Sequence, residues 1–218
     1  MACCLCPGSK PPIETEPVIK TPKSDFSNQW KLTLPDSRET LEVTKSHEPF
    51  YKYTHEGITF TCRSNSGTTP NTKYSRCELR EMNNGKPVSW ETGRPHKLSF
   101  TFKIISKPTK RPKIVVGQIH DDKDDVIELL ANFETGVYEV IHNTSHYGIL
   151  IPKLELDKFY DVTISTSLKG IQTTCGDQKV MVSTKKSVKN CYFKAGNYLQ
   201  SNEKDDEASV FIKNIVIG

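Results

Sequence analysis

The chain has 218 residues and a mass of 24.7 kDa, with 35% hydrophobic and 26% charged residues and a mean hydropathy of −0.54. This composition is typical of one globular domain, and the absence of an apolar run of about 20 residues excludes a membrane-spanning protein. The 30 Lys and Arg residues exceed the 26 Asp and Glu residues, which gives a formal net charge of +4. That excess suits a polyanionic ligand, but it does not distinguish a nucleic acid from an acidic polysaccharide.

The N-terminal segment differs from the rest of the chain. Residues 1–24 contain five prolines and few large apolar residues, so we expect an extended or mobile arm there. The first ten residues lack the apolar core of a secretory signal. No internal repeat or later linker interrupts the remainder, which predicts a single folded domain over residues 25–218.

The seven cysteines do not have the spacing of a metal site. Three of them crowd the N-terminus, and the four in the body form no C-x-x-C pair. The spacing leaves two alternatives open for the body cysteines. They form two short-loop disulfides, Cys62–Cys77 and Cys175–Cys191, or they are four buried free thiols.

The main pattern from about Phe26 onward is an alternation of apolar and polar residues with a period of two, which predicts strands. Two runs, Val126–Phe133 and Val137–His142, are separated by Glu134-Thr135-Gly136 and predict a hairpin. No long segment has the 3.6-residue period of a helix, so a parallel α/β fold is excluded and an all-β sandwich or barrel is expected. The clearest alternating stretches are residues 98–104, 160–164 and 210–216.

Three of the predicted strands carry an unusual set of polar residues on one face. Because side chains alternate along a strand, residues two apart point the same way. If the three strands are neighbours, their polar side chains line one surface that suits a carboxylated polymer. Gly196 lies on the same face, where we expect the missing side chain to admit a ligand to the backbone. The polar residues are Arg76, Glu78 and Arg80 in the first strand, Gln118 and His120 in the second, and Tyr192, Lys194, Tyr198 and Gln200 in the third.

These segments resemble the signature regions of alginate lyases of polysaccharide lyase family 7. The family patterns are R-x-E-L-R, Q-I/V-H and Y-x-K-A-G-x-Y-x-Q, and here they read RCELR at 76–80, QIH at 118–120 and YFKAGNYLQ at 192–200. The run WKLTLP at 30–35 is similar to the opening strand of the family. The resemblance extends from about Phe26 to Gly218. It implies a β-jelly-roll sandwich of two antiparallel sheets with a concave substrate groove.

The resemblance also implies an activity, endolytic cleavage of alginate by β-elimination to give 4,5-unsaturated uronate ends. Arg76 and Gln118 are then the donors that neutralise the substrate carboxylate. His120 is the base that takes the C5 proton, and it shares the neutralising role. Tyr198 is the acid that protonates the leaving oxygen. Nearby Arg or Lys charge is expected to lower the pKa of Tyr198 enough to let it serve as a base as well.

The remaining motif residues are expected to hold the polymer. Arg80, Lys194 and Gln200 form subsites, and Glu78 orients Arg76 or Arg80 by ion pairing. A further substrate-binding residue is Tyr192, for which a purely structural role is the open alternative. The middle residue of Q-I/V-H is associated with substrate preference in the family, and Ile119 favours guluronate-containing chains. We expect no metal or cofactor, a monomer, an acidic polysaccharide rather than nucleic acid as partner, and an extracellular location that suits such a substrate.

Competing functions remain open at this point. The same face would suit a lyase acting on another polyuronate, such as glucuronan, or a polyuronate-binding module without activity. A glycoside hydrolase needs two carboxylates flanking the scissile bond, and the polar motifs contain only Glu78. The acidic run at 121–125 lacks the spacing of an EF-hand loop, so we interpret it as a solvated turn rather than a calcium site.

Overall fold

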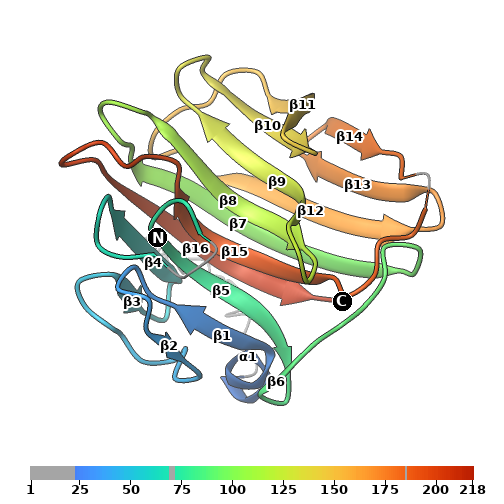
Figure 1. Cartoon of the computed structure of the whole chain (residues 1–218), viewed down its shortest axis with the longest axis horizontal. Coiled ribbons are helices and arrows are strands. Elements are labelled where there is room, and N and C mark those ends of the chain that lie inside the picture. The colour runs from blue at the N-terminus through green and yellow to red at the C-terminus, as the bar shows by residue number, and fades with distance from the viewer. Residues whose placement is uncertain (1–22, 69–71, 185) are drawn as a thin grey trace, which may run out of the picture.

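The computed structural model describes residues 23–68, 72–184 and 186–218, which form two antiparallel β-sheets and one short helix, α1 (Lys23–Gln29) (Figure 1). This confirms the predicted β-jelly-roll sandwich. Residues 1–22 of the expected arm lie outside the described residues, and Lys23 and Ser24 begin α1. Within the described ranges, no helix is long and apolar enough to cross a membrane.

The nine-stranded sheet has the order β11-β10-β9-β8-β15-β5-β1-β2, and β6 pairs with β5 beside this path. Every pairing in it is antiparallel. Its strands are β1 (Trp30–Thr33), β2 (Glu39–Thr40), β5 (Arg76–Asn83), β6 (Lys86–Pro87), β8 (Lys113–His120), β9 (Asp125–Asn132), β10 (Val137–His142), β11 (Ser145–Ile151) and β15 (Tyr192–Leu199).

The seven-stranded sheet has the order β14-β13-β12-β7-β16-β4-β3 and is also antiparallel throughout. Its strands are β3 (Tyr51–Tyr53), β4 (Ile58–Arg63), β7 (His96–Ser106), β12 (Tyr160–Ser167), β13 (Gly170–Cys175), β14 (Gln178–Val182) and β16 (Glu207–Ile217).

The core fills the space between the two sheets, where the alternating apolar residues point. In β7, Leu98, Phe100, Phe102 and Ile104 are all buried, as the period of two predicts. Each such side chain contributes roughly 1.5–3 kcal/mol on burial. Along β16 the alternation ends early, because a register shift follows Lys213. The expected inward residue Val216 is therefore 50% exposed.

The predicted hairpin is formed by β9 and β10, which pair from Val137 opposite Asn132 onward. A turn over residues 133–136 connects them, and Gly136 adopts a positive φ of 74° there. The hairpin extends the nine-stranded sheet directly beside β8. It therefore borders the strand that carries the Gln118-Ile119-His120 motif.

The structure decides between the two alternatives for the body cysteines in favour of free thiols. Cys62, Cys77, Cys175 and Cys191 are all unpaired and buried. The Cys77 thiol donates a hydrogen bond to the carbonyl oxygen of Phe50 at 3.3 Å. Burial raises the pKa of each of the four thiols above its usual value. They are inert core residues rather than reactive groups.

Candidate active site

The three polar segments are neighbours at the centre of the nine-stranded sheet, because β15 lies between β8 and β5. The register places Lys194 opposite both Arg80 and Gln118. It also places Tyr198 opposite Arg76, and Tyr192 opposite His120. The intervening residues point into the core, where Cys77, Leu79, Ile119, Phe193 and Ala195 are fully buried. The sheet thus brings the predicted polar residues of β5, β8 and β15 together on one face, which we call the catalytic face because it carries the residues expected to act in catalysis.

The backbone of β15 is irregular immediately before Tyr198. The register with β8 shifts between Ala195 and Tyr198, and Gly196 has a φ of +151°. A Cβ atom on Gly196 would lie 2.4 Å from the carbonyl oxygen of Cys77 on β5. The close approach of a neighbouring strand therefore requires glycine here. This explanation replaces the expectation that the position leaves room for a ligand.

Asn197 connects the irregular part of β15 to the other sheet. Its side-chain amide donates hydrogen bonds to the carbonyl oxygens of Phe60 at 3.1 Å and Ala208 at 2.8 Å, and the residue is fully buried. These bonds hold the backbone of Asn197 against the core. Tyr198, the next residue, is consequently directed to the opposite side, onto the catalytic face.

His120 is held in a defined protonation state. Its Nδ1 lies 2.6 Å from the carbonyl oxygen of Asp121, which only accepts hydrogen bonds, so we assign the ring proton to Nδ1. Burial and the nearby charge of Lys194 lower the pKa of His120 to about 4. At neutral pH the imidazole is therefore uncharged, and Nε2 carries a lone pair that is able to accept a proton.

Tyr192 supports the His120 ring and a cation at the same time. Its hydroxyl lies 3.2 Å from His120 Nδ1, and the two rings stack at a centroid distance of 5.3 Å. The Arg80 guanidinium lies over the Tyr192 ring, 4.0 Å from the centroid, in a cation–π contact worth about 0.5–2 kcal/mol. Tyr192 is only 8% exposed. The structure thus places Tyr192 as a contact between two predicted site residues.

Tyr198 is a protonated phenol at neutral pH. Burial and the charges of Glu78 and Glu128 raise its pKa above the usual value, and the opposing effect of Arg76 is smaller. This corrects the expectation that neighbouring cations lower the pKa of Tyr198. A phenol that retains its proton is equipped to act as an acid.

A chain of contacts holds the Tyr198 ring from the side. The ring packs against Tyr74 at a centroid distance of 6.2 Å, and Arg111 Nη1 donates a hydrogen bond of 2.7 Å to the Tyr74 hydroxyl. Asp206 fixes the loop that bears Arg111 by accepting hydrogen bonds from the backbone amides of residues 109, 110 and 111. Burial raises the pKa of Asp206, but hydrogen bonds from Ser201 and these amides together have the larger effect and lower it to about 2.

Gln118 and Glu78 form a pair on the floor of the catalytic face. Gln118 Nε2 donates a hydrogen bond of 2.6 Å to Glu78 Oε1, and both residues are almost fully buried. Sequence reasoning expected Glu78 to orient an arginine. The observed hydrogen bond shows that Glu78 orients the Gln118 amide. The amide retains a second N–H group as a donor.

Two further residues of the predicted subsites are placed as follows. Lys194 lies in the centre of the catalytic face, between Arg80 and Gln118, and is 7% exposed. Burial lowers the pKa of Lys194 to about 8, and the attraction of Glu78 partly offsets this effect. Gln200 follows the end of β15, and its side-chain amide contacts the carbonyl oxygen of Tyr198 at 3.5 Å.

Sequence reasoning missed two carboxyl groups on β9. Glu128 lies opposite Gln118, and Asp125 lies opposite His120. Burial, together with neighbouring carboxylates, raises the pKa of Glu128 to about 8 and that of Asp125 to about 6. The expected solvated turn is confirmed for Asp122 and Asp124, which are exposed, but not for Asp125, which is half-buried at the start of β9. The missed signal was a lone glutamate in the otherwise apolar sequence VIELLA.

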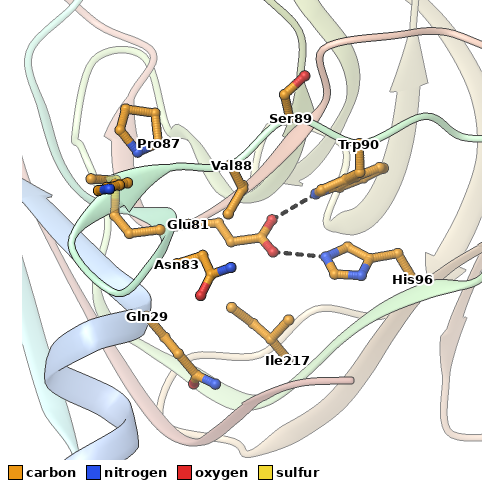
Figure 2. A pocket seen from close by; sticks show the side chains of 11 residues that line it. Gln29, Glu81, Asn83, Pro87, Val88, Ser89, Trp90, His96 and Ile217 are labelled. Carbon is orange, nitrogen blue, oxygen red and sulfur yellow. Dashed lines mark hydrogen bonds and ion pairs between the residues drawn. The ribbon is translucent and has the colours of Figure 1, made fainter.

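A cavity of about 600 Å³ lies beside the end of β5, and Figure 2 shows Glu81 between Trp90 and His96 there. The Glu81 carboxylate accepts hydrogen bonds from Trp90 Nε1 at 2.8 Å, His96 Nε2 at 2.7 Å and the Phe193 backbone amide at 2.9 Å. Trp90 also packs against Phe193, at a ring-centroid distance of 4.8 Å. Because Phe193 follows Tyr192, Glu81 anchors the end of β15 that meets His120.

Comparisons with known proteins agree with the predicted family and fold. A profile of the alginate lyase family matches residues 24–218. Alginate lyase AlgAT5 from polysaccharide lyase family 7 is 32% identical, with a TM-score of 0.81 over 88% of this chain and 95% of that one. A search of curated proteins gave no match.

Two further solved structures share the fold at lower identity. The alginate lyase from Corynebacterium sp. is 23% identical, with a TM-score of 0.79 over 88% of this chain and 95% of that one. A variant of family 7 alginate lyase A1-II′ in complex with product (GGG) is 23% identical, with a TM-score of 0.75 over 88% and 96%. From the family profile and the 32% identical structure, we conclude that this chain belongs to the alginate lyases of polysaccharide lyase family 7 and is a polysaccharide lyase.

Proposed function

We propose that the protein cleaves alginate endolytically by β-elimination, with Arg76, Gln118, His120 and Tyr198 as its catalytic residues. The observation that carries the proposal is the register of β8, β15 and β5, which gathers these four residues on one face. Family membership supports the choice of alginate over glucuronan. His120 is able to accept a proton and Tyr198 is able to donate one, which supports an enzyme rather than a binding module.

The first chemical requirement is to stabilise negative charge on the substrate carboxylate. The C5 proton of a uronate is poorly acidic, and its removal moves charge onto the adjacent carboxylate. Arg76 offers a forked cation for this charge, and Gln118 offers its second N–H group. The hydrogen bond to Glu78 orients that group in advance. Losing one such preorganised donor typically costs a factor of about 10²–10³ in rate.

The second requirement is a base and an acid in suitable protonation states. His120 Nε2 takes the C5 proton, and the electron pair of that bond forms the C4–C5 double bond. The bond between C4 and O4 breaks, and O4 takes the phenolic proton of Tyr198. The low pKa of His120 and the raised pKa of Tyr198 keep both groups neutral and ready for this exchange.

The surrounding residues form subsites for an acidic polysaccharide. Arg80 and Lys194 supply positive charge along the catalytic face, and Tyr192 holds Arg80 in place. Gln200 lies beside Tyr198 at the end of β15. We propose that the protein binds the polymer as a monomer and favours guluronate-containing chains. Ile119 is buried, so its influence on that preference is indirect, through the flanking Gln118 and His120.

The test is product formation on separate polymannuronate, polyguluronate and glucuronan substrates. We expect the ultraviolet absorbance of a conjugated unsaturated uronate to rise with alginate and to rise fastest with polyguluronate. Mass spectrometry at early times is expected to show oligomers of several lengths, as endolytic cleavage requires. Product from glucuronan alone would reassign the substrate. Binding of alginate without any absorbance change would refute the catalytic proposal.

A further inference from the structure

One acidic side chain on the catalytic face has no role in the reaction described above. Glu128 lies on β9 directly opposite Gln118, and its neighbours Ile127 and Leu129 point into the core. Its side chain therefore faces the same side of the sheet as the catalytic residues, where it is partly covered. Within the described part of the chain, no hydrogen bond or ion pair is formed by the Glu128 carboxyl group.

The surroundings of Glu128 disfavour a negative charge. Lys194 on β15 is a cation that partly offsets the burial of the carboxyl group, but several neighbouring carboxylates oppose it. On the other side, β10 presents the uncharged Ile141 opposite Glu128. The titratable and charged groups on and around these strands include Asp124 before β9, Asp125 at the start of β9, Glu78, Arg76 and Arg80 on β5, His120 on β8, Tyr192, Lys194 and Tyr198 on β15, Glu139 on β10 and His146 on β11.

This arrangement matters because the proposed substrate is itself a polyanion. An ionised Glu128 beside Gln118 would repel the carboxylates of the bound chain. A neutral carboxyl group would instead supply a hydrogen-bond donor. Burial and the neighbouring carboxylates raise the pKa of Glu128 to about 8, so the neutral form predominates at neutral pH.

We propose that Glu128 is a substrate-binding residue that acts as a neutral carboxylic acid, donating a hydrogen bond to an oxygen of the uronate chain next to the reacting sugar. The inference rests on the proposed function, because it assigns a role to Glu128 only within that binding surface. Glu128 takes no part in the proton transfers. Its contribution is to binding, and it disappears when the group ionises.

The ionisation of Glu128 predicts how binding of the uronate chain depends on pH. Below pH about 8 Glu128 keeps its proton and binds the chain, whereas above pH about 8 it ionises and repels the chain. If binding requires the neutral form, the dissociation constant rises by up to about tenfold per pH unit on the alkaline side. Lys194 also has a pKa of about 8 and loses its positive charge over the same range. The experiment must therefore separate the two residues.

The test is calorimetric binding of alginate oligosaccharides, from pH about 6 to about 9.5, in a Tyr198→Phe background that slows turnover. We expect the dissociation constant to rise on the alkaline side in this parent protein. Glu128→Gln keeps the size and an N–H donor but does not ionise, so its alkaline rise in dissociation constant is expected to shrink to the part that the loss of charge on Lys194 contributes. Lys194→Arg keeps its charge throughout the range, and the alkaline rise is expected to persist in that control. A rise that persists in Glu128→Gln and vanishes in Lys194→Arg would overturn the inference.

Infrared spectroscopy of the unliganded protein supplies an independent measurement. At pH about 7 we expect the carbonyl stretch of a neutral carboxylic acid, and we expect this band to be absent from Glu128→Gln. Oligosaccharide binding without such a band would contradict the role inferred for Glu128 and would leave the proposed function intact. A band without oligosaccharide binding at any pH would show that the proposed substrate is wrong and would remove the binding role of Glu128 with it.

Discussion

At the scale of single residues, burial prepares two groups for opposite tasks. Burial disfavours the charged form of any side chain, so it lowers the pKa of a histidine and raises that of a tyrosine. His120 and Tyr198 are both partly buried on the catalytic face, and both are neutral over the same pH range as a result. A neutral imidazole accepts a proton and a neutral phenol donates one. Burial at the sheet centre therefore prepares both groups for the proton transfers that we propose.

Tyr198→Phe tests the acid role directly. The change removes one hydroxyl group and retains the ring contact with Tyr74. We expect kcat to fall by about 10²–10⁴-fold, because general acid catalysis contributes that much, while KM stays nearly constant. Initial rates from the absorbance of the unsaturated product measure both constants. A kcat within twofold of the unsubstituted protein would show that another group protonates the leaving oxygen.

At the scale of elements, β15 determines the geometry of the site. It contributes Tyr192, Lys194 and Tyr198 to the catalytic face, and it contacts both motif-bearing strands. Its register shift near Gly196 is accompanied by the hydrogen bonds of Asn197 to the opposite sheet. The position of Tyr198, the proposed acid, therefore depends on a backbone feature two residues earlier in the chain.

Gly196→Ala is expected to destabilise the fold substantially. The new Cβ would meet the Cys77 carbonyl oxygen at 2.4 Å, and the φ of +151° is unfavourable for alanine. We expect a loss of about 1–3 kcal/mol or more in the free energy of unfolding, measured by urea denaturation.

Gly136→Ala is the matched control for this measurement. Gly136 also has a positive φ, of 74°, but a Cβ there would meet nothing within 4 Å. Gly136→Ala is therefore expected to lower the free energy of unfolding only through the unfavourable backbone conformation, by about 1–2 kcal/mol. If the two variants were equally stable, the close approach of β5 to β15 would not be what requires glycine at position 196.

The elements also show how far the sequence could predict the site. Alternation along each strand assigned Arg76, His120 and Tyr198 to the polar faces of their own strands, but only the strand order brings these faces together. It did not predict that Glu78 would bond to Gln118, because that contact crosses from β5 to β8 over an intervening strand. It also did not predict the position of Glu128, because the register between β8 and β9 determines which residue of β9 lies beside Gln118.

At the scale of the whole molecule, the two sheets pack around one apolar core with no disulfide among the described cysteines. The period of two predicted the fold class, since each apolar face had to pack against another sheet. It failed for Val216, because the register shift after Lys213 changes which side chains point inward. The choice between thiols and disulfides also needed the structure. It depends on distances between strands that the sequence does not contain.

The body thiols are expected to react only after unfolding. Cys62, Cys77, Cys175 and Cys191 are buried, and their raised pKa values disfavour the reactive thiolate. We expect alkylation of the native protein, mapped by peptide mass spectrometry, to leave these four positions unmodified. Alkylation in denaturant without a reductant is expected to modify all four. Modification that appeared only after reduction would reveal disulfides instead.

The insertion of β15 between β8 and β5 also has a consequence for synthesis of the protein. The two outer motif strands are translated first, but they become second neighbours only when a segment near the C-terminus is inserted between them. Such non-local pairing is slow and comes late in folding. A nascent chain on the ribosome therefore has no assembled reaction centre until β15 has emerged. The order of strands thus delays activity until all three motif strands have been made.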